Sequence, residues 1–129
     1  RMTSVLNVDE IAAKDGTSAV TLTKQHAAKV WANFDMDSTQ VLNDSFNVAS
    51  IADVATGKST ITYTNSLSNA NYSCVTNSVH DSGSYFTTLN VAHDTPPTAS
   101  AVQLEAMVQN TGAHSDAELN SMANHGDLA

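Results

Sequence analysis

The sequence of 129 residues contains little of what many enzymes and binding domains depend on. It has one cysteine, two prolines, five glycines, and only one Trp, three Tyr and three Phe. One cysteine cannot form an internal disulfide, and isolated glycines do not make a phosphate-binding loop. No apolar run approaches the roughly 20 residues that a membrane-spanning helix needs. The composition therefore argues against a disulfide scaffold, a nucleotide-binding enzyme and insertion into a membrane.

Basic residues are also scarce. Five lysines and arginines stand against thirteen aspartates and glutamates, which gives a formal net charge of -8. A chain with this balance repels phosphate backbones and anionic lipid, and its basic residues never cluster. We therefore expect neither nucleic acid nor a membrane surface among its partners.

Ser, Thr and Asn are abundant and make up roughly a third of the chain. Thr packs well on a pleated surface, whereas Ser and Asn compete with the hydrogen bonds of a helical backbone. Apolar residues account for 41% and charged residues for 14% of the sequence, so the chain has enough hydrophobic content to fold. The composition favours strands and turns over helices.

Alternation of apolar and polar residues marks two half-buried strands. Residues 101–109 place four apolar side chains on one face and polar ones on the other, and residues 60–64 place Ile61 and Tyr63 opposite three threonines. Residues 29–35 carry Trp31 opposite three apolar side chains, and residues 84–91 carry Phe86 opposite another apolar set. These two segments are apolar on both sides, which predicts central or interface strands.

Turn signals separate these segments. Gly-containing turns are predicted at 55–58, 81–83 and 110–112, and the two prolines predict a stiff loop at 94–98. Many short strands joined in this way predict an all-β fold, namely an antiparallel β-sandwich or a meander.

Residues 1–28 differ from the rest. They contain two short extended pieces around a turn at 14–17, with too little apolar surface to form a core alone. We expect 1–28 to be an extended segment that docks or interlocks with neighbours, and 29–129 to be the β-sandwich domain. Because a small domain with few aromatic residues has a modest core, we expect it to gain stability by forming oligomers.

Candidate catalytic and metal-binding groups are weak. His80-Asp81 and His93-Asp94 pair a base with an acid, but adjacent residues on a strand point to opposite faces. The histidines lack the close spacing of metal ligands, which leaves a metal shared between symmetry-related chains as the alternative. We expect no catalytic residues, no cofactor and no enzymatic activity.

An ordered set of motifs resembles a domain common in bacteriophage tail fibres and related virion proteins. It consists of Lys-x-Trp-x-x-Phe at 29–34, Asp-Ser-Phe-Asn-Val at 44–48, Thr-Gly at 56–57, Ile-Thr-Tyr-Thr at 61–64 and Ala-Asn-Tyr at 70–72. The resemblance implies a homotrimeric β-rich fibre or fibre-tip module that resides in the virion and contacts the host surface. The expected partners are other copies of the chain, tail or capsid proteins, and a host surface glycan.

Two sets of residues are candidates for this role. Binding residues concentrate on loops held by a rigid scaffold, so we expect receptor contacts at Asp81, Ser82, Asp94 and Thr95. Large side chains within strands are expected to be core or interface anchors: Trp31, Phe34, Phe46, Tyr63 and Tyr72. Two alternatives stay open, a capsid decoration or tail adaptor without a receptor, and a polysaccharide depolymerase. The depolymerase is disfavoured because no paired carboxylates stand out as acid and nucleophile.

Overall fold

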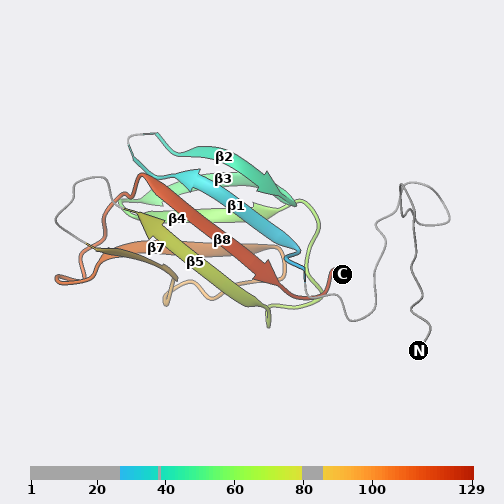
Figure 1. The fold of residues 1–129 in the computed structure, drawn as a ribbon. Helices are drawn as coiled ribbons and strands as arrows, with labels where there is room; N and C mark the ends of the chain where they lie inside the picture. Colours follow the sequence, from blue (N-terminus) through green and yellow to red (C-terminus); the bar gives the residue numbers. More distant parts are fainter. Residues whose placement is uncertain (1–26, 38, 80–85) are drawn as a thin grey trace, which may run out of the picture.

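The computed structural model describes residues 27–37, 39–79 and 86–129, and these form two antiparallel sheets without a helix (Figure 1). Sheet I has the order β2-β1-β8-β5 and sheet II the order β3-β4-β7-β6. The all-β antiparallel prediction is confirmed. No described segment is a helix long and apolar enough to cross a membrane. The strands are β1 Val30–Asp35, β2 Val41–Phe46, β3 Val48–Ala55, β4 Lys58–Tyr63, β5 Ser73–Val79, β6 Thr87–Val91, β7 Ala101–Val108 and β8 Leu119–His125.

Strands with clear alternation lie where the sequence predicts them. β7 matches the segment 101–109, and β4 matches 60–64 but begins two residues earlier, at Lys58. β1 alternates buried and half-buried positions and lies between β2 and β8, so it is the central strand that its two apolar faces predict. The proline-containing loop at 94–98 connects β6 to β7. The predicted extended pieces within 1–26 and the turn at 81–83 lie outside the described residues.

β6 covers part of the predicted segment 84–91 and is an edge strand of sheet II, so of the two predicted alternatives, a central or an interface strand, the central one is wrong. Its outward positions are Thr88 and Asn90, and Phe86 precedes the strand with 81% of its surface exposed. β2 and β3 follow each other directly and are separated at Asn47. A residue with positive φ breaks the extended run there.

Asn47 moves the chain from sheet I to sheet II. Its φ of 58° lies in the left-handed region, which Asn tolerates better than most residues. Its side-chain amide donates to the Lys29 carbonyl at 3.1 Å and to the Asn65 carbonyl at 3.0 Å, and its Oδ1 accepts from the Asn65 N–H at 2.7 Å. The side chain therefore holds the corner between β2 and β3 against the start of β1.

One hydrophobic core joins the two sheets. A Val, Leu, Ile, Phe or Met side chain that is fully buried in this core stabilises the fold by about 1.5–3 kcal/mol. At the β5 and β6 side, polar groups link the sheets, since the Thr76 hydroxyl donates to the Leu89 carbonyl at 2.5 Å. Sheet I contributes Val30, Ala32, Phe34 and Met122 to the core, and sheet II contributes Ile61, Tyr63, Leu89, Val102, Leu104 and Ala106.

Candidate functional site

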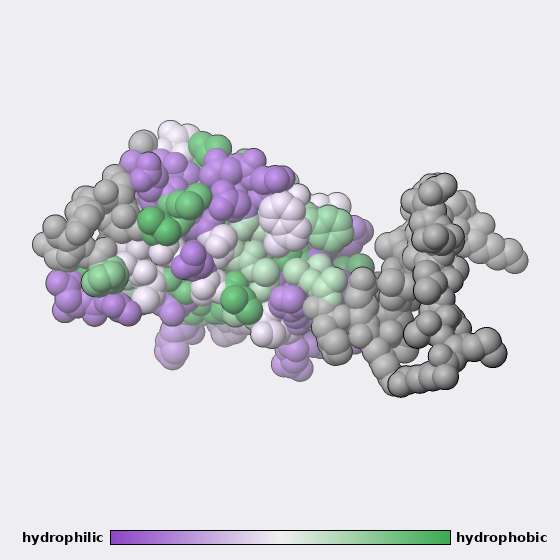
Figure 2. Space-filling view, in the orientation of Figure 1, coloured by the Kyte–Doolittle hydropathy of each residue, from purple (hydrophilic) through white to green (hydrophobic). Residues whose placement is uncertain are grey.

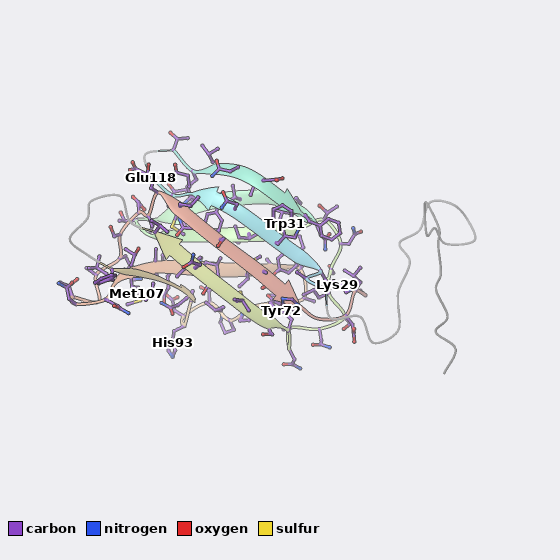
Figure 3. All side chains as sticks on the ribbon, viewed as in Figure 1. Lys29, Trp31, Tyr72, His93, Met107 and Glu118 are labelled. Carbon is purple, nitrogen blue, oxygen red and sulfur yellow. The ribbon has the colours of Figure 1, made fainter. Side chains whose placement is uncertain are left out.

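The outer face of sheet I, the side away from the core, carries a row of apolar side chains that crosses all four strands. Trp31 on β1 is paired with Phe46 on β2 and with Ala123 on β8, and Ala123 is paired with Val75 on β5. Directly opposed residues of an antiparallel pair lie on the same face of the sheet. Phe46 is 53% exposed and Val75 is 59% exposed. We call these four residues the apolar row; Figure 3 shows Trp31 on this side of the sheet.

A polar row runs beside the apolar row, two residues further along each strand. Asn33 on β1 is opposite Asp44 on β2 and Ser121 on β8, and Ser121 is opposite Asn77 on β5. Asn43 donates to the Asn33 side-chain oxygen at 3.1 Å. We call Asp44, Asn33, Ser121 and Asn77 the polar row.

A second group of apolar side chains lies on the same face beyond the polar row. Leu119 on β8 and Val79 on β5 are paired and are 44% and 49% exposed. Val41, near the same end of sheet I, is 48% exposed. Figure 2 views the molecule from the side of sheet I, where hydrophobic and hydrophilic patches lie interleaved. The outer face thus has two apolar zones with a polar row between them.

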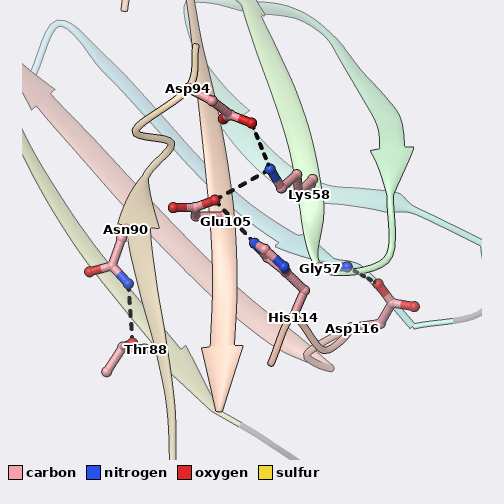
Figure 4. A network of polar contacts seen from close by, with 8 residues as sticks. All are labelled: Gly57, Lys58, Thr88, Asn90, Asp94, Glu105, His114 and Asp116. Atoms are coloured by element: carbon pink, nitrogen blue, oxygen red, sulfur yellow. Dashed lines mark hydrogen bonds and ion pairs between the residues drawn. The ribbon is translucent and has the colours of Figure 1, made fainter. Parts of the chain in front are cut away.

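The outer face of sheet II is different, because its charged groups are paired within the chain (Figure 4). Lys58 Nζ lies 3.1 Å from Asp94 Oδ2 and 3.6 Å from Glu105 Oε2, and His114 Nε2 lies 3.1 Å from the same Glu105 oxygen. The hydrogen bond from Lys58 holds the pKa of Asp94 below its usual value, and the same bond raises the pKa of Lys58. We call Lys58, Asp94, Glu105 and His114 the charged cluster.

The structure describes two of the four loop residues that are predicted to contact a receptor. Asp94 is exposed and belongs to the charged cluster, a contact that the sequence does not reveal because Lys58 is 36 residues away. Thr95 is exposed in the same loop. Asp81 and Ser82 lie outside the described residues. The described part of the predicted contact set is therefore Asp94 and Thr95 alone.

The predicted anchors divide into two groups. Phe34 and Tyr63 lie in the core with 0% and 5% exposure, and the Tyr63 hydroxyl donates to the hydroxyl of half-buried Tyr72 at 2.8 Å. Trp31 and Phe46 point the other way and form half of the apolar row. Sequence alternation places Trp31 on the face opposite Phe34 but does not say which face points outward, and its neighbours in the row depend on strand pairing.

A buried polar chain lies beneath sheet I. Asn124, fully buried on β8, donates from Nδ2 to the Tyr63 hydroxyl at 2.6 Å. Burial is the largest cause of the raised pKa of Tyr63. Burial also raises the pKa of the Cys74 thiol to about 11. A protonated, half-buried thiol is a poor nucleophile at neutral pH. These groups serve packing and hydrogen bonding.

Within the described ranges, no three His, Cys, Asp or Glu side chains are close enough to hold a metal ion. No family model, curated protein or solved structure matches this chain. The chain is thus an all-β protein with two antiparallel four-stranded sheets, one face that exposes apolar side chains and one face whose charges are paired. Its function is inferred from these surfaces and from the sequence motifs.

Proposed function

We propose that this chain is a non-enzymatic structural component of a bacteriophage virion. In this proposal it is a β-sandwich module of a tail fibre or fibre tip, it assembles as a homotrimer, and it contacts the host cell surface. The sequence motifs that resemble tail-fibre domains support the virion role. The observation that carries the structural role is the apolar row of sheet I, in which the described residues of a single copy leave Phe46 and Val75 exposed and Trp31 and Ala123 half-buried.

An uncovered row of this kind indicates assembly. Contiguous exposed apolar patches on soluble proteins mark contact sites, whereas isolated apolar residues need no explanation. The row includes an aromatic pair, Trp31 and Phe46, and aromatic residues are enriched at the centres of protein interfaces. Burial against another molecule removes these side chains from water.

Host contact is assigned to the loop between β6 and β7. Asp94 and Thr95 are exposed there, on a loop that joins two paired strands and is stiffened by Pro96 and Pro97. A hydroxyl and a carboxylate offer hydrogen bonds to a host glycan. The second candidate function is a capsid decoration or tail adaptor, in which the apolar row packs on another virion protein and no receptor is bound.

The first test measures the solution mass of the full chain by analytical ultracentrifugation. A homotrimer has three times the chain mass of 13.6 kDa. A stable monomer at micromolar concentration would contradict the assembly. The measurement is repeated over a range of concentrations, because weak association shows itself as a mass that rises with concentration.

The second test separates a fibre module from a decoration protein. Purified protein is incubated with host cells, and a Thr95→Ala variant is compared with Thr39→Ala, a matched change at another exposed threonine. We expect Thr95→Ala to weaken cell binding and Thr39→Ala to leave it unchanged. Tight incorporation into particles without binding to cells would favour the decoration role, and turnover of host polysaccharide would contradict a non-enzymatic protein.

A further inference from the structure

We infer that the outer face of sheet I is the contact surface between copies of this chain, turned towards the axis of the assembly so that its apolar and polar rows meet those of the neighbouring copies. The number of copies rests on the proposed homotrimer; the choice of face rests on the structure. Four features of the face carry the inference: its size, its charge, its polar row and the contrast with sheet II.

The size of the face suits a stable contact. Four strands about 4.8 Å apart and about 20 Å long give a face of about 19 Å by 20 Å, or about 400 Å² in projection. Side chains that stand out from the sheet make the accessible area larger than the projection. Specific interfaces bury about 800 Å² of accessible surface per partner. The projected area is about half of that value, so a lasting association requires the whole face, and not the apolar row alone, to be covered.

Charge selects where two copies can meet. Each chain carries a formal charge of -8, so identical copies repel one another except where carboxylates are sparse. β5 and β8 contain no aspartate or glutamate, and the outward carboxylates of sheet I are confined to Asp35 and Asp44 on β1 and β2. A strongly basic partner would find few groups to pair with on this face. A second copy fits it better.

The polar row suits an identical partner for a different reason. Asn33, Ser121 and Asn77 each carry a hydrogen-bond donor and an acceptor, so these three members of the polar row are able to pair with those of another copy, whereas the Asp44 carboxylate only accepts and needs a donor opposite it. A buried polar group without a partner costs about 1–3 kcal/mol, and a shifted arrangement would place these groups against the apolar row. The polar row therefore fixes the register in which two copies meet.

Sheet II does not offer such a surface. Its outer face carries the charged cluster, whose ion pairs are made within the chain. Beside the cluster, Gln103 donates to the Thr60 hydroxyl at 3.3 Å. Burial of this face would remove charged groups from water without a new partner, which is unfavourable. The two sheets thus differ in the way expected for an inner and an outer face of an assembly.

A pair of matched variants tests the choice of face. Val75 lies in the apolar row and is 59% exposed, whereas Val54 lies on β3 of sheet II and is 51% exposed. We expect Val75→Glu to raise the concentration at which the assembly dissociates by at least about tenfold, because it buries a charge between acidic copies. Val54→Glu should leave that concentration unchanged. Circular dichroism checks that each variant keeps the β fold.

Disulfide trapping gives an independent readout that does not rely on dissociation. Ala123→Cys places a thiol at the middle of the apolar row, and Cys74→Ser in the same chain removes the native thiol. We expect disulfide-linked dimers of this variant under mild oxidation, and none from Val54→Cys in the same background. Covalent dimers would locate the row between copies even if Val75→Glu fails to fold.

The outcomes separate this inference from the proposed function. If the chain is a trimer that Val75→Glu leaves intact and Ala123→Cys does not crosslink, the assembly stands and the choice of sheet I is wrong. Dissociation by Val54→Glu alone would also overturn the choice of face. If the unmodified chain is a monomer at all concentrations, both the proposed homotrimer and the inference fail.

Discussion

Replacement of Gly57 by alanine tests a close approach between backbone segments. Gly57 lies in the turn between β3 and β4 with φ +65°, and a Cβ placed there would lie 2.7 Å from the Ala106 carbonyl oxygen and 2.7 Å from the Ser115 nitrogen. Both neighbours are backbone atoms, so neither is able to rotate away. The same turn makes hydrogen bonds that any shift would disturb, from the Ala106 N–H to the Gly57 carbonyl at 2.7 Å and from the Gly57 N–H to Asp116 at 2.5 Å.

Gly112 supplies a matched control for this change. Its φ is +68°, nearly that of Gly57, but a Cβ there meets nothing within 4 Å. An alanine in the left-handed region costs about 1–2 kcal/mol at either position. Overpacking adds about 1–3 kcal/mol at position 57 alone. We therefore expect Gly57→Ala to lower the free energy of unfolding by about 2–5 kcal/mol, and Gly112→Ala by about 1–2 kcal/mol.

The assay is urea unfolding followed by circular dichroism, with all variants at one protein concentration so that association contributes equally. Gly57→Ala should have the lower midpoint with an unchanged slope. Equal midpoints for the two variants would refute the reasoning, because they would show that no steric contact distinguishes the two turns. A changed slope would indicate an altered unfolded or native state instead.

Three further predictions concern side chains. Tyr63→Phe should lower the free energy of unfolding by about 1–3 kcal/mol, because it leaves the buried Asn124 amide without the partner it has at 2.6 Å. Burial raises the folded-state pKa of Cys74 from 9.0 to about 11. The stability that the protonated thiol provides is therefore full below pH 9 and falls as the pH rises towards 11. Cys74→Ala should make the free energy of unfolding less dependent on pH in this range. Lys58→Met should raise the pKa of Asp94 towards its ordinary value, measured by NMR titration of the carboxyl carbon.

Each of these has a contradicting result. Unfolding free energies of Tyr63→Phe and the unmodified chain that agree within about 0.5 kcal/mol would show that the hydroxyl is not a needed partner. A pH profile that is the same with and without Cys74 would show that its ionisation is not linked to folding. An Asp94 pKa that ignores Lys58→Met would show that the ion pair does not persist in solution.

The apolar row also bears on how a single copy behaves before the proposed assembly. In the described part of a single copy, Phe46 and Val75 are exposed and Trp31 is half-buried on the same face, and exposed apolar patches promote unspecific association. The polar row beside it interrupts the hydrophobic surface and reduces this tendency.

The sequence by itself determined the strands whose side chains alternate. β4 and β7 follow from period-two patterns, β1 follows from its two apolar faces, and the turn with Gly57 follows from its local residue types. These features depend on neighbours along the chain, because a strand places alternate residues on opposite faces wherever it lies. The pattern around Trp31 therefore predicts a central or an interface strand without knowledge of its partners.

Only the tertiary structure decided what lies beside each strand. The sequence does not predict β8, because its inward positions include the polar residues Asn120 and Asn124. Both are fully buried. Their hydrogen-bond partners lie far away in the sequence or in the loop before β8. The apolar row joins strands whose pairing is set by register, and the Lys58 to Asp94 contact spans 36 residues. Pairing between distant strands depends on the packing of the whole core, so no local pattern encodes it.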